Sequence, residues 1–98
     1  MAGSIISLAD GSAMTASFRR KFPNETNAVY YSSNVYNDLL AQEGCVGIRI
    51  YNALDAEGKM TNVLVGVDDH GNDLYEGKLY DSGYKTPPGP VAPNPLNA

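Results

Sequence analysis

The strongest constraint on the fold is a pair of β-branched stretches joined by a short polar connection. Three β-branched residues alternate with other residues along 45–52, and alternation with a period of two indicates a strand that buries one face. A second such stretch covers residues 60–68, and the Asp- and Gly-containing connection between them is typical of a hairpin. The two stretches therefore predict an antiparallel pair of strands.

The register of this hairpin is predicted by matching like residues across the two strands. Closing the connection with Leu54 opposite Lys59 pairs β-branched residues throughout: Val46 with Val67, Ile48 with Val65, and Ile50 with Val63. Cross-strand pairs of this kind stabilise a sheet, so this face is expected to be covered by helices. The other face then has Gly47 directly opposite Gly66. Extending the register through the next turn pairs Asp68 with Asp73 and places Tyr75 beside Gly66.

That second face is the candidate binding surface. It carries four larger residues around the two glycines: Arg49, Tyr51, Leu64 and Tyr75. Either Tyr75 shields the glycines within the domain, or a partner approaches the backbone there, since Tyr and Arg are enriched at binding hot spots. The sequence is compatible with both interpretations.

The remaining elements complete an α+β fold. Ser7 is placed to cap a helix that ends at Pro23, and Ser32 or Ser33 caps a second helix that Gly44 stops. Strands are expected at 28–31, 45–52, 60–68 and 73–80, which gives the order α-β-α-β-β-β. This order predicts a two-layer domain, with two helices on one face of a largely antiparallel sheet of about four strands.

Domain organisation follows from length and proline placement. Ninety-eight residues suffice for one domain, expected over residues 5–84. Five of the six prolines lie at 87–95, so residues 85–98 are expected to form an extended tail.

Composition excludes several classes of function. The net charge of −4 argues against nucleic-acid binding, and no apolar run reaches the roughly 20 residues that a membrane helix needs. A single cysteine, Cys45, cannot form an internal disulfide, and the N-terminal residues do not resemble a signal peptide. A cytoplasmic location is expected.

Two groups of residues have side chains that could support chemistry. The register brings Cys45 near His70, which could form a thiol–imidazole pair, although a small buried cysteine and a solvated histidine are the commoner arrangement. Residues 68–73 resemble part of a calcium loop, but they lack the bidentate glutamate of an EF-hand and suit a hairpin turn. No catalytic residue, metal site or cofactor is predicted.

A resemblance covers most of the chain. The segments GCVGIRIYNALD at 44–55, VLVGVD at 63–68 and GNDLY at 71–75 resemble a group of small bacterial proteins without an assigned activity. Their proline-rich ending carries cysteines, which this chain lacks there. The resemblance implies a single bacterial cytoplasmic domain and transfers no site.

The sequence therefore favours a non-catalytic protein-interaction or assembly module. It would associate with itself or with another protein through the face carrying Arg49, Tyr51, Leu64 and Tyr75. The alternative, from another class, is a small-ligand binder or thiol enzyme that uses the Cys45 and His70 end of the sheet.

Overall fold

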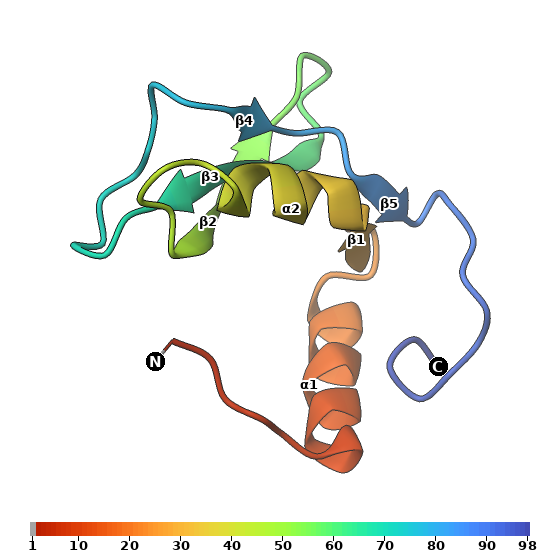
Figure 1. The fold of residues 1–98 in the computed structure, drawn as a ribbon. Coiled ribbons are helices and arrows are strands. Elements are labelled where there is room, and N and C mark those ends of the chain that lie inside the picture. The colour runs from red at the N-terminus through yellow and green to blue at the C-terminus, as the bar shows by residue number, and fades with distance from the viewer. Residues whose placement is uncertain (1) are drawn as a thin grey trace. The chain divides into compact units, whose positions relative to one another are not determined.

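The computed structural model describes residues 2–98. The elements, in chain order, are α1 (Leu8–Lys21), β1 (Ala28–Tyr30), α2 (Ser33–Leu40), β2 (Gly47–Leu54), β3 (Met60–Val67), β4 (Leu79–Tyr80) and β5 (Tyr84–Thr86). The α+β class with antiparallel pairing is confirmed (Figure 1). The prediction of one sheet of about four strands is wrong, because β1 pairs with β5 and a separate sheet has the order β2-β3-β4.

The described chain divides into two compact units. One comprises Met1–Val29 with Lys85–Ala98, and the other comprises Tyr30–Tyr84. The second unit holds the three-stranded sheet and α2 alone, so it does not supply the predicted pair of covering helices.

α1 begins where the sequence predicts. The Ser7 hydroxyl accepts a hydrogen bond from the backbone N–H of Asp10 at 3.0 Å, which satisfies one of the free donors at the helix start. Neither of the helices that the described residues form, of 14 and 8 residues, is long and apolar enough to cross a membrane.

The proline-rich end folds back within the first unit. The Arg19 guanidinium donates to the carbonyl of Leu96 at 2.6 Å and to that of Ala98. Leu96 and Ile6 also flank Gly11, where a Cβ atom would lie 3.5 Å from each side chain. Specific contacts with α1 therefore hold the last residues of this segment.

β2 and β3 pair as an antiparallel hairpin, but the predicted register is wrong by one residue. Ile48 lies opposite Gly66, and Ile50 lies opposite Leu64. Because successive residues of a strand point to opposite faces, Gly47 and Gly66 lie on opposite sides of the sheet. The proposed pair of facing glycines does not exist.

The connecting turn sets this register. Gly58 has a φ of +77°, and the Asp55 carboxylate accepts the backbone N–H groups of Glu57 and Lys59, both at 2.9 Å. A three-residue loop that ends in a left-handed glycine is a common hairpin closure. It brings Asp55 opposite Lys59, with a backbone hydrogen bond of 2.8 Å between them, instead of Leu54.

The turn after β3 repeats this geometry. The Asp68 N–H donates to the carbonyl of Asn72 at 2.9 Å, and Gly71 has a φ of +81°. Val67 consequently bridges to Asp73, where Asp68 was expected opposite Asp73. The same physical cause therefore shifts both predicted registers by one residue.

The last strand of this sheet is much shorter than predicted. β4 contains Leu79 and Tyr80, which pair with β3, and most of the expected strand 73–80 is irregular. A turn replaces it, in which the Gly77 N–H donates to the carbonyl of Leu74 at 3.0 Å.

α2 covers one face of β2 and β3 (Figure 1). Leu39 on α2 and Leu64 on β3 are fully buried. The Asp38 carboxylate accepts hydrogen bonds from the Lys78 ammonium group at 2.6 Å and from the Tyr80 hydroxyl. The Lys78 hydrogen bond is the main cause that lowers the pKa of Asp38, and these contacts fasten α2 to β4.

β3 is buried on both faces. Leu64 faces α2, whereas Val65 and Thr61, which point to the other side, are also buried. Val65 lies between Arg49 on β2 and Leu79 on β4. A strand of this kind is apolar at nearly every position, so matching of β-branched residues does not select one register.

Candidate functional site

Two of the predicted binding residues meet at Asp73. The Arg49 guanidinium donates to the Asp73 carboxylate and, at 3.2 Å, to the carbonyl of Gly71, while the Tyr51 hydroxyl donates to the other Asp73 oxygen. The Tyr51 hydrogen bond and the Arg49 charge lower the pKa of Asp73. The hydrogen bond to Asp73 raises the pKa of Tyr51 and of Arg49. These side chains therefore fasten β2 to the turn after β3.

The other two predicted residues do not share this face. Leu64 is 0% exposed and lies under α2, so it cannot contact a partner. Tyr75 is 71% exposed but belongs to the connection between β3 and β4. Of the four predicted residues, only Arg49 and Tyr51 therefore lie together on this face, because the shift in register places Leu64 on the opposite side of the sheet.

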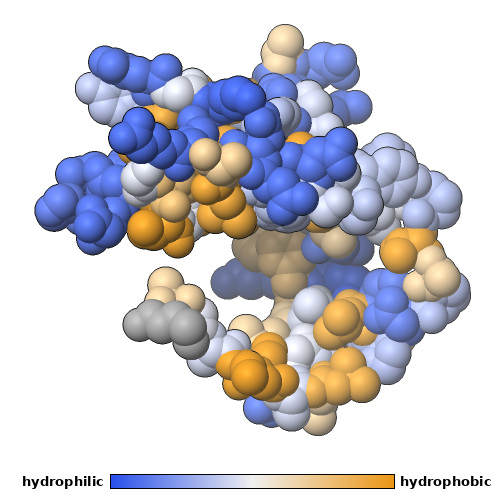
Figure 2. Space-filling model, in the orientation of Figure 1, coloured by the Kyte–Doolittle hydropathy of each residue, from blue (hydrophilic) through white to orange (hydrophobic). Residues whose placement is uncertain are grey.

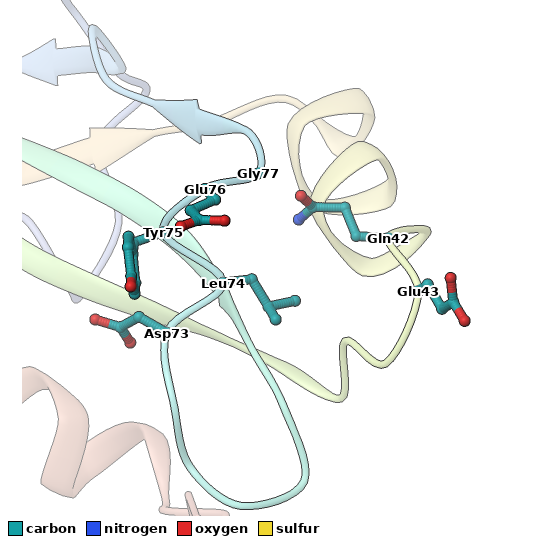
Figure 3. Close-up of a pocket in the computed structure, with 7 residues that line it drawn as sticks. All are labelled: Gln42, Glu43, Asp73, Leu74, Tyr75, Glu76 and Gly77. Atoms are coloured by element: carbon teal, nitrogen blue, oxygen red, sulfur yellow. The ribbon is translucent and has the colours of Figure 1, made fainter.

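A shallow hollow of about 370 Å³ lies beside Tyr75 (Figure 3). Its lining combines the end of α2 with the connection between β3 and β4: Gln42, Glu43, Asp73, Leu74, Tyr75, Glu76 and Gly77. Figure 3 shows the Glu43 carboxylate pointing away from Gln42 and Leu74. The acidic groups of the lining therefore do not converge on one point.

Gln42 connects the end of α2 with the residue before β4 by two hydrogen bonds. Its amide nitrogen donates to the carbonyl of Leu39 at 2.9 Å, and its amide oxygen accepts the backbone N–H of Lys78 at 3.0 Å. A Cβ atom on Gly66 would lie 2.9 Å from that nitrogen and 2.8 Å from the Cys45 sulfur. Gly66 therefore admits the close packing of the segment after α2 against β3.

The two side chains of the alternative site, Cys45 and His70, have separate partners in the structure. The Cys45 thiol donates to the carbonyl of Gly47 at 3.2 Å, and His70 Nδ1 lies 3.0 Å from the Asp69 carboxylate. The ligand atoms that cluster around His70 come from Asp68 and Asp69 and not from Cys45. The hollow described above includes neither Cys45 nor His70.

The acidic residues around His70 are organised by the turn. The Asp68 carboxylate accepts the backbone N–H groups of His70 and Asn72, both at 2.9 Å. Asp55 makes the equivalent pair of bonds in the first hairpin. The Asp68 carboxylate therefore stabilises its turn as the Asp55 carboxylate does in the first Asp-x-x-Gly connection.

The surface feature that sequence reasoning missed is the outer edge of β2. In the order β2-β3-β4, no strand of residues 2–98 pairs with β2 on the side away from β3. The Asp55 N–H donates to the carbonyl of Lys59, so the odd-numbered residues of β2 are the ones whose backbone groups bond to β3. In an antiparallel pair these residues alternate with residues whose backbone groups point to the other side. The backbone groups of Ile48, Ile50 and Asn52 therefore point outward.

The same edge carries exposed apolar side chains. Ile50 and Leu54 are 57% and 73% exposed and lie on the α2 side of the sheet. Figure 2 shows hydrophobic residues reaching the surface of this unit beside a largely hydrophilic area. An edge with open hydrogen-bonding groups and apolar side chains is a template for strand pairing. The Asp-x-x-Gly turns were the sequence signal that could have fixed the register, whereas the position of β2 at the edge follows only from the strand order.

No protein-family model, curated protein or solved structure matches this chain. The case for a function therefore depends on the geometry of the unit itself.

Proposed function

We propose that the protein is a non-catalytic interaction module that adds an extended protein segment to the free edge of β2. The observation that carries this proposal is the combination of outward backbone groups at Ile48, Ile50 and Asn52 with exposed apolar side chains along one strand. In strand addition, main-chain hydrogen bonds supply affinity and alternate side chains supply specificity.

β2 also lacks the features that normally protect an edge. Monomeric proteins block edge strands with prolines, lysines, inward-pointing charges or very short strands. The eight residues Gly47–Leu54 contain neither proline nor lysine, and their one charged residue, Arg49, is paired with Asp73. An unprotected edge of this length supports a role in association.

Charge supports a protein partner over a nucleic acid. The unit Tyr30–Tyr84 contains nine acidic residues against Arg49, Lys59 and Lys78, a net charge of −6, which disfavours a polyanion. The proposal places the module in the cytoplasm, where the free thiol of Cys45 stays reduced. It also places the protein among the small bacterial proteins that it resembles.

Amide hydrogen exchange of the full chain tests strand addition directly. In the dilute protein, the amides of Ile48, Ile50 and Asn52 should exchange quickly, because they point away from β3, whereas those of Arg49 and Tyr51 should be protected. A synthetic peptide with the sequence of residues 46–54 should protect the outward amides. If neither this peptide nor a high concentration of the chain protects them, the proposal is wrong.

A pair of proline variants supplies the control. Asn52→Pro removes an outward N–H and should leave the hairpin folded while peptide binding weakens, since proline is tolerated where an edge N–H faces solvent. Tyr51→Pro removes an N–H that bonds to β3 and should disrupt the hairpin itself. Equal tolerance of both substitutions would contradict the assignment of the outward groups.

A further inference from the structure

We propose that the occupant of the β2 edge is a second copy of the same chain. The two copies of β2 pair antiparallel around a twofold axis at Ile50, which joins two three-stranded sheets into one of six strands. This inference rests on the proposed function, because it uses the same edge and names the segment that fills it.

The backbone pattern of β2 is self-complementary in this register. An antiparallel partner must bond to the outward residues, which are the even-numbered ones. With Ile50 on the axis, Ile50 of one copy faces Ile50 of the other, and Ile48 faces Asn52. Every hydrogen-bonded pair across the axis therefore joins two outward-pointing residues.

Exposed apolar side chains lie along this seam. Ile50 lies on the axis, and Leu54 lies four residues further along the same face of β2. Both residues are more than half exposed in the single chain. Pairing would cover apolar surface at Ile50 beside α2, which a monomer otherwise leaves open to solvent.

The other face of the strand contains no conflict. Arg49 of one copy lies opposite Tyr51 of the other, and Gly47 lies opposite Ala53. Arg49 is the one charged residue of β2, and it does not face itself in this register. Like charges directly opposite each other would destabilise the pair, and the seam has none.

The negative charge of the unit makes the salt dependence of self-association a test of the second-copy proposal. Two units of −6 repel each other, although the seam itself carries no acidic residue. An interface made by one strand from each copy belongs to the small, weak class, so we expect a dissociation constant on the order of 100 µM. Salt screens the repulsion, so self-association should tighten with salt, whereas binding to a basic partner would weaken.

Sedimentation equilibrium of the full chain over a range of concentrations tests this first. We expect a monomer–dimer equilibrium that tightens severalfold between about 0.05 M and about 0.5 M NaCl, as the Debye length shortens. This measurement needs no variant. A chain that stays monomeric at all concentrations and salt levels overturns the inference.

A matched pair of substitutions then locates the interface. Ile50→Lys places two ammonium groups face to face at the axis and should weaken association at least about tenfold. Leu79→Lys makes the same change at a residue of similar exposure, 54% against 57%, on β4, and should leave association unchanged. The opposite result would place the contact at another edge and overturn the inference.

Disulfide trapping tests the register. In a Cys45→Ala chain, Ile50→Cys should form a linked dimer, because paired Cα atoms of this type lie about 5.5 Å apart, within disulfide reach. Leu54→Cys is the control, since Leu54 is more exposed but lies roughly 27 Å from its counterpart in the antiparallel pair. Linking at both positions, or at position 54 alone, would overturn the register.

The two proposals fail in different ways. If the chain stays monomeric while the 46–54 peptide protects the outward amides, the occupant is a segment of another protein and strand addition still holds. If the chain associates and neither this association nor the 46–54 peptide protects those amides, both proposals are wrong. If the chain associates without protecting them but the peptide does, only the proposal of a second copy is wrong.

Discussion

Replacing Gly66 on β3 and replacing Gly47 on β2 by alanine should have opposite effects on the stability of the fold. A Cβ atom on Gly66 would lie 2.8 Å from the Cys45 sulfur and 2.9 Å from the Gln42 amide nitrogen, whereas one on Gly47 would meet no atom within 4 Å. Gln42 cannot move aside without losing its hydrogen bonds to Leu39 and Lys78. Gly66→Ala should therefore strain the packing behind α2, and Gly47→Ala should not.

The expected magnitudes follow from these distances. Overpacking a tight site costs about 1–3 kcal/mol, while replacing glycine by alanine in a compatible conformation gains about 0.4–1 kcal/mol by restricting the unfolded chain. Gly66→Ala should lower the free energy of unfolding by about 1–2 kcal/mol, and Gly47→Ala should raise it by about 0.5 kcal/mol. Combining Gly66→Ala with Cys45→Ala should recover part of the loss, because one of the two close contacts disappears.

Urea unfolding followed by NMR signals from the unit Tyr30–Tyr84 measures both variants in the part of the chain that they affect. Equal effects of the two substitutions would refute the reasoning, because the register predicted from the sequence places Gly47 and Gly66 side by side in one environment. A larger loss for Gly47→Ala would refute it as well.

Other predictions concern single hydrogen-bonded groups. Ser7→Ala should destabilise α1 by about 1 kcal/mol by removing the acceptor for the Asp10 N–H, which helix-specific amide exchange would detect. Because the pKa of Asp73 is lowered from 3.8 in the folded protein, its contribution to stability is present above that value and is lost as the pH falls through the lower folded pKa. Asp73→Asn should therefore remove part of the acid dependence of urea unfolding, and an unchanged dependence would mean that its contacts contribute nothing. The pKa of Tyr51 is raised above 10.0, so the phenolate absorbance that Tyr51→Phe removes should titrate above pH 10, and a normal titration would contradict its bond to Asp73.

Local chemistry made the elements themselves predictable. Ser7 identified the start of α1, and the alternating β-branched residues identified β2 and β3, because capping and burial periodicity act over a few neighbouring residues. The antiparallel α+β class followed from the order of these elements. The pairing of β1 with β5 was not predictable in this way, since those strands are far apart in the sequence and carry no pattern that matches one to the other.

The candidate site depended on a smaller detail. The alternation in β2 placed Ile50 on the face that a helix covers, and Ile50 does lie on the α2 side. The Asp55 carboxylate and the left-handed Gly58 close a shorter loop than expected, so the residue of β3 opposite each residue of β2 changes by one. That shift buries Leu64 under α2 and separates it from Arg49 and Tyr51.

The sequence by itself determined the two helices, the hairpin strands β2 and β3 and the turns that follow them, but not the short strands β4 and β5. Only the tertiary structure shows that α2 packs on the Leu64 side of β3, because β3 is apolar on both sides and its hydrophobicity does not select one of them. It also decided that β2 lies at the outside of its sheet. An edge is defined by the strand that is missing beside it, and no residue within β2 encodes that absence.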